Sequence, residues 1–261
     1  TQITGILNGT TNYILTKMSR DGSSYEEVLK EAQQLGYAER NPEADVEGYD
    51  ACRKIAILTS LAFGSTVNYE DVCTEGITKI STEDFAYAEK IGCVVKLLAT
   101  SKKINDKVYA ITAPFLIEKE HPLYNVNDVL NGIYIKGNVI GDVMFFGAGA
   151  GKLPTASAVV ADVVDCVKHK GKNVMTVWSS EKIELGNVED VERYFFVRVK
   201  GSVDKDLSEV EKAFGDIDVV TVDGIDGEFG FVTSLMTEKA FNAAAANVEV
   251  INRIRIDKTR I

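Results

Sequence analysis

The first third of the chain alternates apolar and polar residues at helical spacing. Apolar positions between residues 3 and 18 predict a helix broadly over 3–18, which Gly5 and Gly9 weaken. Ser24-Tyr-Glu-Glu27 is a capping box, so a second helix is expected to begin there and to end at Gly36. A third helix is predicted from Val46 or Asp50 to Phe63, ending at Gly64.

From Cys93 the period of the apolar residues shortens to two. Two β-rich runs, VVKLLATSKK and KVYAITAPFLI, are separated by INDK, which is a hairpin signal. GIYIKGNVIGDVMFFGAGAG predicts two more strands, and PTASAVVADVVDCVKHK predicts a long helix. A short capped helix is expected at 83–91. The fold class is therefore α/β to α+β, an open mixed sheet with helices on one face.

From Arg193 onward the predicted elements follow the order βαββαβ in about 70 residues, the ferredoxin-like pattern. Residues 172–190 form the transition to this unit. Two domains are expected, residues 1–185 and residues 190–261.

Composition narrows the partners and the compartment. The 261 residues have a formal net charge of −10 and no basic stripe, so nucleic-acid and anionic-membrane surfaces are not expected as partners. No apolar run is long enough to span a membrane. The cysteines are widely spaced, which indicates reduced thiols and a cytoplasmic protein. Both histidines, His121 and His169, are interpreted as surface residues, and no metal site is expected.

The stretch from Gly36 to Lys54 concentrates the chemistry. It contains five acidic residues and then two bases, just before an apolar helix. Asp50 and Lys54 are four residues apart, so on a helix they share one face. Two interpretations remain open: a surface ion pair worth only about 0.3–0.5 kcal/mol, or a lysine that donates a proton to an oxyanion while Asp50 orients it.

A glycine-rich loop, Phe145-Phe-Gly-Ala-Gly-Ala-Gly-Lys152, joins a predicted strand to a predicted helix. Backbone amides at such a junction can approach a phosphate or a cofactor. The spacing matches neither G-x-G-x-x-G nor a Walker loop. A cofactor contact and a simple tight turn are both compatible with it.

Three motifs, in this order, resemble the homoserine dehydrogenase family. They are GILNGTTNYIL, the acidic loop GYAERNPEADVEGYDACRK, and FFGAGAGKLPTASAVVADVVD. The C-terminal βαββαβ unit resembles the ACT domain of the bacterial monofunctional enzymes. The resemblance extends over essentially the whole chain.

This resemblance implies NAD(P)-dependent interconversion of L-aspartate 4-semialdehyde and L-homoserine. Matched to the family motif, Lys54 is the proton donor to the carbonyl oxygen. The matched substrate-site positions are Glu39, Asp50, Asp45, Thr10, Gly9 and Tyr37, and Gly151 matches a glycine near the nicotinamide. A homodimer or higher homo-oligomer is implied as well, whereas Glu43, Glu47 and Arg53 are interpreted as ordinary surface charges.

The sequence also departs from the family pattern. The family's Rossmann domain with its GxGxxG loop is absent from these residues, as are a second lysine and a segment that binds a monovalent cation. The chain is therefore expected to be the substrate-binding, dimerising and regulatory portion, inactive by itself. In the ACT-like unit, Lys200-Gly-Ser-Val-Asp replaces the usual Asp-x-Pro-Gly turn. The alternatives are a non-catalytic ACT-containing amino-acid sensor or, less favoured, another oxidoreductase of similar layout.

Overall fold

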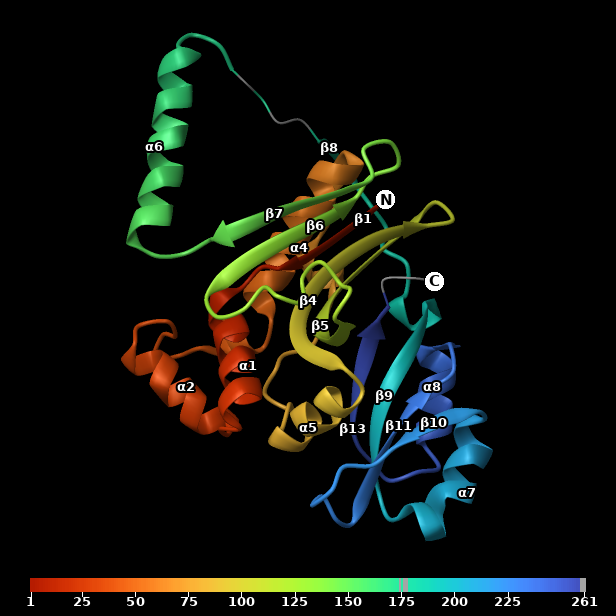
Figure 1. The fold of residues 1–261 in the computed structure, drawn as a ribbon. Coiled ribbons are helices and arrows are strands. Elements are labelled where there is room, and N and C mark those ends of the chain that lie inside the picture. Colours follow the sequence, from red (N-terminus) through yellow and green to blue (C-terminus); the bar gives the residue numbers. More distant parts are fainter. Residues whose placement is uncertain (174, 176–177, 259–261) are drawn as a thin grey trace.

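The computed structural model describes residues 1–173, 175 and 178–258, and most of its strands join one long mixed sheet (Figure 1). The strand order is β10-β11-β9-β13-β5-β4-β1-β6-β7, with β12 beside β9 and β3 beside β5. Its strands are β1 Gln2–Ile6, β3 Cys73–Thr74, β4 Cys93–Ile104, β5 Lys107–Glu118, β6 Leu130–Lys136, β7 Asp142–Ala148, β9 Glu192–Lys200, β10 Ile217–Val220, β11 Glu228–Thr233, β12 Met236–Thr237 and β13 Val250–Asp257. Two short strands, β2 Ser65–Thr66 and β8 Ser179–Lys182, pair separately. The predicted mixed sheet is confirmed.

Local capping signals mark the ends of several helices. They are α1 Gly9–Asp21, α2 Tyr25–Gln34, α3 Glu43–Val46, α4 Tyr49–Phe63, α5 Thr82–Lys90, α6 Lys152–Lys168, α7 Val203–Phe214 and α8 Glu238–Ala245, with 3₁₀ turns η1 Tyr69–Asp71 and η2 Val188–Asp190. The capping box of Ser24 with Glu27 is present at the start of α2. Ser81 and Asp84 form another at α5. Gly64 ends α4 in the left-handed conformation, which a glycine adopts without strain.

The prediction of a helix over 3–18 is wrong in its first part. Residues 2–6 are strand β1, and the helix begins only at Gly9. β1 lies between β4 and β6 and pairs antiparallel with both, so its backbone groups bond to strands about a hundred residues away. Tertiary pairing thus overrides a local pattern that suits either structure.

The N-terminal half of the sheet is covered on both faces. Helices α1, α4 and α5 pack on one face (Figure 1). On the other, Leu123 and Val126 from the segment after β5 join a separate apolar cluster with Phe115. Alternation along β4 divides the two sides: Leu97 packs in the cluster of α1, and Leu98 packs in the cluster of Leu123. Helices thus cover one face, as predicted, and a loop covers the other.

His121 begins that covering segment and corrects another expectation. Its side chain is buried rather than exposed. Nδ1 accepts a hydrogen bond from the backbone N–H of Leu123 at 3.0 Å, and Nε2 lies 3.7 Å from Oδ2 of Asp257. The histidine therefore fastens the loop that covers the sheet, which its position before a proline does not reveal.

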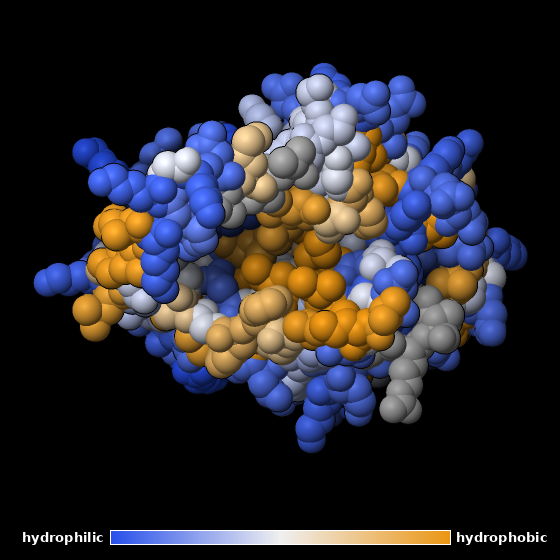
Figure 2. Space-filling model, turned by 90° about the horizontal axis from the view of Figure 1, so that it is seen from above, coloured by the Kyte–Doolittle hydropathy of each residue, from blue (hydrophilic) through white to orange (hydrophobic). Residues whose placement is uncertain are grey.

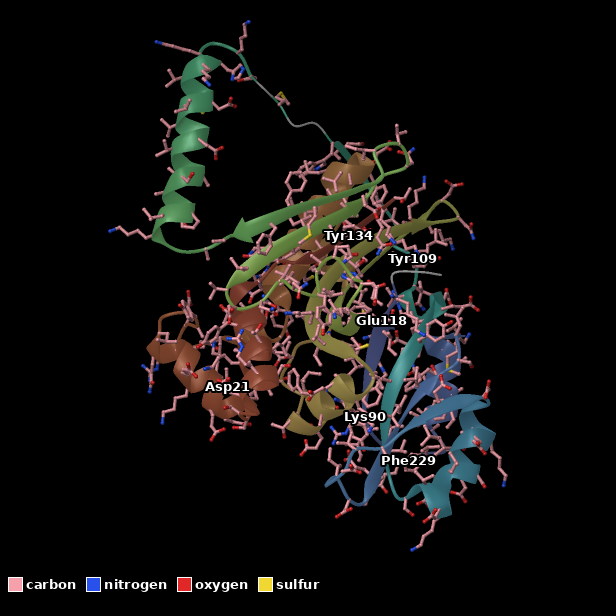
Figure 3. The ribbon with its side chains drawn as sticks, in the orientation of Figure 1. Asp21, Lys90, Tyr109, Glu118, Tyr134 and Phe229 are labelled. Carbon is pink, nitrogen blue, oxygen red and sulfur yellow. The ribbon has the colours of Figure 1, made fainter. Side chains whose placement is uncertain are left out.

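The C-terminal residues form the predicted βαββαβ unit. Its strands take the order β10-β11-β9-β13, and α7 and α8 pack with them around a core that contains Phe229, labelled in Figure 3. β13 pairs antiparallel with β9 on one side and parallel with β5 on the other. The unit therefore continues the sheet of the N-terminal half, and the division at about residue 185–190 stays a prediction about independent domains.

Helix α6 has no buried residue and stands away from the sheet (Figure 1). Its apolar side chains are exposed, as are those of the neighbouring strand β7. They include Met144, Phe145, Phe146, Leu153, Val159, Val160, Val163, Val164 and Val167. Seen from above, apolar residues gather around a hollow (Figure 2). Exposed apolar surface of this extent is typical of an interaction face.

Candidate active site

A cavity of about 650 Å³ opens where α1 and α4 begin. The residues that line it come from residues 7–10, residues 35–37 with Asp45, the first two turns of α4, residues 129–133 at the start of β6, and the glycine-rich loop. They are Leu7, Asn8, Gly9, Thr10, Leu35, Gly36, Tyr37, Asp45, Asp50, Lys54, Val129, Asn131, Ile133, Gly149, Ala150 and Gly151. The fold thus brings all three sequence motifs to one place.

Lys54 lies one turn into α4, where the helix faces the cavity. Its Nζ donates to Oδ2 of Asp50 at 2.6 Å and to the carbonyl oxygen of Leu7 at 3.0 Å. The ion pair between positions i and i+4 is therefore formed, and the lysine side chain is still 49% exposed. An ammonium has three N–H donors. Two are used by the described residues, so one remains for a ligand in the cavity.

Asn8 connects the two carboxylates of the site. Its Nδ2 donates to Oδ1 of Asp45 at 2.7 Å and to Oδ2 of Asp50 at 3.0 Å. Its Oδ1 accepts from the backbone N–H of Thr11, which caps α1. Among the described residues, the other oxygen of each carboxylate makes no hydrogen bond, so both acids keep an acceptor for a ligand.

The start of α1 forms a close-packed wall of the cavity. At Gly9 an added Cβ would lie 2.9 Å from the carbonyl oxygen of Val129, so a larger residue would push the two apart. The hydroxyl of Thr10 donates to the carbonyl oxygen of Tyr37 at 2.7 Å. These contacts fix the width of the cavity between α1, the segment after α2 and the chain before β6.

The glycine-rich loop forms the opposite rim. An added Cβ at Gly149 would lie 2.5 Å from Oδ1 of Asn131, and Gly151 has a φ of +109°, a region that favours glycine. Asn131 in turn donates to the carbonyl oxygen of Ile6 at 3.0 Å. The glycines thus let the backbone run close to the cavity, as the cofactor interpretation of this loop requires.

Most of the site residues predicted from the sequence meet here, with one exception. Lys54, Asp50, Asp45, Thr10, Gly9, Tyr37 and Gly151 all line the cavity. Glu39 lies on an exposed loop and does not line it. Among the charges expected to stay outside, Glu47 accepts from the hydroxyl of Thr78, and Arg53 lies over the ring of Tyr69.

Two asparagines of the site were missed from the sequence. The signal for Asn8 is present, because an asparagine before Gly-Thr-Thr suits a helix N-cap, but the predicted helix covered it. No local signal marks Asn131, whose partners lie about 125 residues away in β1.

A buried lysine, also missed, supports the wall from behind. Lys96 on β4 is 2% exposed, and its ammonium donates to the carbonyl oxygen of Val126 at 2.6 Å and to Oδ1 of Asn127 at 2.9 Å. It also donates to Oδ1 of Asn12 on α1 at 3.2 Å. Burial lowers the pKa of Lys96 to about 8, although Asp128 opposes this. Lys96 therefore joins α1 to the segment that ends in Val129.

The described part of the chain shows no metal site and no disulfide bond. Histidine, cysteine, aspartate and glutamate side chains form no cluster there that could hold a metal ion. All four cysteines are free thiols. Among the helices that the structure describes, none has the length and apolar character needed to cross a membrane.

Comparison with known proteins decides the family. A family model described as homoserine dehydrogenase matches residues 1–164, which include every residue that lines the cavity. This chain belongs to the homoserine dehydrogenase family. The matched region ends within α6, so the family model does not include the C-terminal unit.

Relatives of this family agree in sequence and in structure. The homoserine dehydrogenase of Synechocystis is 53% identical over 169 residues, which are 63% of this chain and 39% of the relative. The crystal structure of a homoserine dehydrogenase from Thiobacillus denitrificans matches with a TM-score of 0.88 and 33% identity over 98% of this chain and 64% of the other. The structural match therefore includes the C-terminal unit, and the chain spans well under half of the curated relative's length.

A more distant match comes from a hyperthermophilic archaeal homoserine dehydrogenase mutant whose structure is in complex with NADPH. It is 30% identical, with a TM-score of 0.54, over 67% of this chain and 49% of the other.

Proposed function

We propose that the cavity at Lys54 binds L-homoserine and L-aspartate 4-semialdehyde, and that the chain supplies the substrate-binding part of an NAD(P)-dependent homoserine dehydrogenase. The observation that supports this most is the convergence of one ammonium and two carboxylates with unused bonding capacity in a cavity of about 650 Å³. Both substrates are zwitterions with a carbonyl or hydroxyl at C4, so they need the same pair of charges.

The carboxylates of the site suit the substrate's ammonium group. Asp45 and Asp50 lie 37 and 42 residues after Asn8 in the sequence, but the amide of Asn8 donates to both, and both line the cavity. A charge-assisted hydrogen bond to each oxygen would orient the amino acid. The backbone N–H of Thr10, in the first turn of α1, suits its carboxylate, because the hydroxyl of Thr10 already donates to Tyr37.

Lys54 is then the acid at C4. Reduction of the aldehyde adds a hydride to C4, and the carbonyl oxygen becomes an alkoxide that takes one proton from Nζ of Lys54 to give the alcohol. In the reverse direction the neutral amine of Lys54 takes the hydroxyl proton as the hydride leaves. Asp50 holds Nζ on the helix face that meets the cavity, at 2.6 Å. A bound nicotinamide supplies or accepts the hydride.

The glycine rim suits the nicotinamide end of such a cofactor. Gly149 and Gly151 have no side chain between the backbone and the cavity, and Asn131 supports the loop from the other side. The described residues contain no dinucleotide fingerprint of the G-x-G-x-x-G type, so only the nicotinamide end of the cofactor is assigned to them.

Glu39 completes the proposed substrate set on the strength of the family motif alone. It follows Tyr37 on an exposed loop, whose backbone is fastened by Gln33. A Glu39→Gln variant that binds homoserine as tightly as the wild type would remove it from the set.

The C-terminal unit is proposed to be an ACT domain, and the protein a cytoplasmic homodimer. The βαββαβ order and the match over 98% of the chain support the former, and the four free thiols support the compartment. For the dimer, the exposed Phe145 and Phe146 on the edge strand β7 offer apolar area. A Phe145→Glu variant should shift the mass measured by light scattering toward the monomer, and an unchanged mass would exclude this surface as the interface.

The function is tested by binding and by turnover together. Calorimetry on the 261-residue chain should detect L-homoserine, with binding weakened by Asp50→Asn. In the protein as its gene encodes it, Lys54→Met should lower kcat for NADP⁺-dependent homoserine oxidation about 10²–10⁴-fold. Homoserine or threonine binding that survives Lys54→Ala, in a protein with no dehydrogenase activity, would instead favour an amino-acid sensor.

A further inference from the structure

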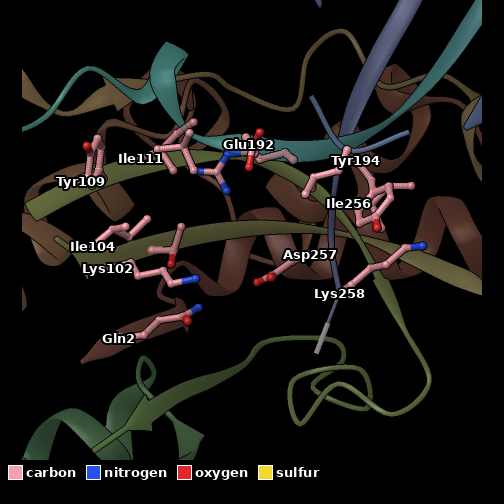
Figure 4. Close-up of a pocket in the computed structure, with 14 residues that line it drawn as sticks. Gln2, Lys102, Ile104, Tyr109, Ile111, Glu192, Tyr194, Ile256, Asp257 and Lys258 are labelled. Atoms are coloured by element: carbon pink, nitrogen blue, oxygen red, sulfur yellow. The ribbon is translucent and has the colours of Figure 1, made fainter. Parts of the chain in front are cut away.

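A second cavity, of about 70 Å³, lies between the two halves of the sheet (Figure 4). Gln2, Thr100 and Lys102 from β1 and β4 line one side, and Arg193, Asp257 and Lys258 line the other. The cavity shares no residue with the pocket at Lys54. Its volume corresponds to roughly two water molecules at about 30 Å³ each, which is enough for a small ion.

Arg193 is unusual in this cavity because one of its buried donors has no partner among the described residues. Its Nε is buried and has no hydrogen-bond acceptor among the described residues. The guanidinium lies 5.6 Å from the centre of the Phe115 ring. Burial lowers the pKa of Arg193 and the charge of Arg255 lowers it further, while the charges of Asp257 and Glu238 oppose this shift. Buried donors are paired in the great majority of cases, and an unpaired buried cation is costly.

Two fully buried arginines of the C-terminal unit show what the half-buried Arg193 lacks. Arg198 donates to carboxylate oxygens of Glu228 and Asp84 at 2.8 Å each. Arg255 donates to Glu75 at 2.7 and 2.8 Å. Within residues 1–173, 175 and 178–258, Arg193 makes no such bond, although it lies in the same sheet. By analogy with Arg198 and Arg255, the acceptor that Arg193 lacks there would be an anion.

The protein's own acids near the cavity do not fill that role. Asp257 turns its carboxylate toward the middle of the cavity, as do Gln2 and Lys102 with their polar ends (Figure 4), yet its described contact is with His121 at 3.7 Å. Glu192 is exposed. Lys102 adds a second cation beside Arg193, and Lys258 lies over the ring of Tyr194. The lining therefore has three cations and two acids.

We propose that this cavity binds a small oxyanion, of carboxylate or phosphate type, which Arg193 and Lys102 hold from opposite halves of the sheet. A planar guanidinium fork with free donors suits the paired oxygens of such groups. The amide of Gln2 supplies a neutral N–H donor on the same side as Lys102, whereas the hydroxyl of Thr100 already donates to the carbonyl oxygen of Ile3. The bound anion neutralises Arg193 and connects the βαββαβ unit to β1 and β4. This site does not depend on the function proposed for the Lys54 pocket.

Thermal unfolding of the whole chain tests the site. Malonate and inorganic phosphate are titrated separately against sodium chloride of equal ionic strength. A saturable rise of the unfolding midpoint is expected for at least one of them, because a ligand of the folded state stabilises it. Comparison of the two arms identifies carboxylate or phosphate as the preferred group.

Two arginine variants make the result specific. Arg193→Gln should weaken the apparent affinity at least about tenfold, while its midpoint without anion should be no lower than that of the wild type, since a buried unpaired charge is removed. Arg20→Gln, a surface arginine of α1 outside the cavity, should respond as the wild type does. A midpoint that rises without saturation, or equally in both variants, would show surface ion binding only and would overturn the proposal.

Discussion

Two groups of charged residues in this molecule are built in opposite ways. Between the two halves of the sheet, Arg255 is 1% exposed and donates to both Glu75 and Glu238, and Arg253 donates to the same two acids. At the cavity, Lys54 and Asp50 are partly exposed and each keeps unused bonding capacity. The charges of the first group bond to one another, whereas the second group keeps unused donors and acceptors for a ligand.

This difference separates structural from functional charge. Hydrogen bonds and the charge of Arg255, together with Arg253, lower the pKa of Glu75 to about 2, although burial alone would raise it. Such a saturated group holds its elements together, and removing one member leaves the others buried and unpaired. An open group at a cavity contributes little to folding, so its residues can be replaced with little loss of stability.

The largest expected effect is therefore at Arg255. Arg255→Met should lower the free energy of unfolding by about 3–5 kcal/mol, because Glu75 and Glu238 lose their buried partner. Urea unfolding followed by circular dichroism measures the loss. Arg20→Met, which removes an exposed contact to Asp128 at 3.4 Å, is the matched control and should cost at most about 1 kcal/mol. Equal losses of unfolding free energy in the two variants would contradict the structural role given to Arg255.

The same network predicts acid sensitivity. The pKa of Glu75 is depressed in the folded state, so its stabilising contribution is complete above the unfolded value of 4.5 and is lost as the pH falls toward about 2. Unfolding measured across this window should show the loss in the wild type and a smaller one in Glu75→Gln. Identical pH profiles would contradict the role given to Glu75.

Lys96 extends the comparison to alkaline pH, because its ammonium group is buried but bonds only to neutral acceptors. Its pKa of about 8 is below the usual 10.5, so the unfolded chain binds more protons between these values and stability should rise with pH there. The stability difference between the wild type and Lys96→Met should change by about 3 kcal/mol from pH 8 to 10.5. Denaturant unfolding at several pH values measures it, and a constant difference would refute the assignment.

Asn8 is expected to have a smaller effect on stability. Asn8→Ala removes the N-cap of α1 and should cost about 1 kcal/mol of stability, and it also frees Asp45 and Asp50 from their common donor. Asn8→Asp keeps the capping oxygen and adds a third carboxylate to the site. Asn8→Asp should lose more stability than Asn8→Ala, because a carboxylate oxygen then replaces the amide donor that faces Asp45 and Asp50. Denaturant unfolding measures both losses, and an Asn8→Asp variant as stable as the wild type would contradict the bridging role of Asn8.

The smallest effect on stability is expected at Lys54. Lys54→Met removes an exposed pair at i and i+4, so the free energy of unfolding should change by no more than about 0.5 kcal/mol. The same variant is the one expected to abolish most of the turnover. A loss of stability comparable to that of Arg255→Met would mean that Lys54, too, belongs to the structural group.

The sequence was informative wherever the cause of a structure is local. The capping boxes at Ser24 and Ser81, the left-handed Gly64 and the turn at Asn105 and Asp106 all depend on neighbours within a few residues. The strand alternation after Cys93 and the βαββαβ order were predictable for the same reason. Most of the cavity was also anticipated, because the family motif places its residues.

What the sequence did not show depends on distant partners. β1 is a strand because β4 and β6 lie on either side of it, and no window of local residues contains that fact. From the sequence, Lys96 and His121 look like surface residues. The segment of residues 121–130 folds over the sheet, which covers Lys96 and buries His121 within that segment. The glycine at position 9 is explained only by Val129, which approaches it from 120 residues away.

The parallel pairing of β13 with β5 has a consequence for how the molecule is made. Arg255 and Glu75, whose bond closes this seam, are 180 residues apart in the chain. During translation, the strands that are synthesised early keep an unpaired, apolar edge until the last strand of the sheet has been made. Contacts of such long separation slow folding, and an unpaired edge is prone to aggregation. Chaperone demand and sensitivity to late stop codons should therefore be high in this protein, even though the pocket at Lys54 is lined only by residues between Leu7 and Gly151.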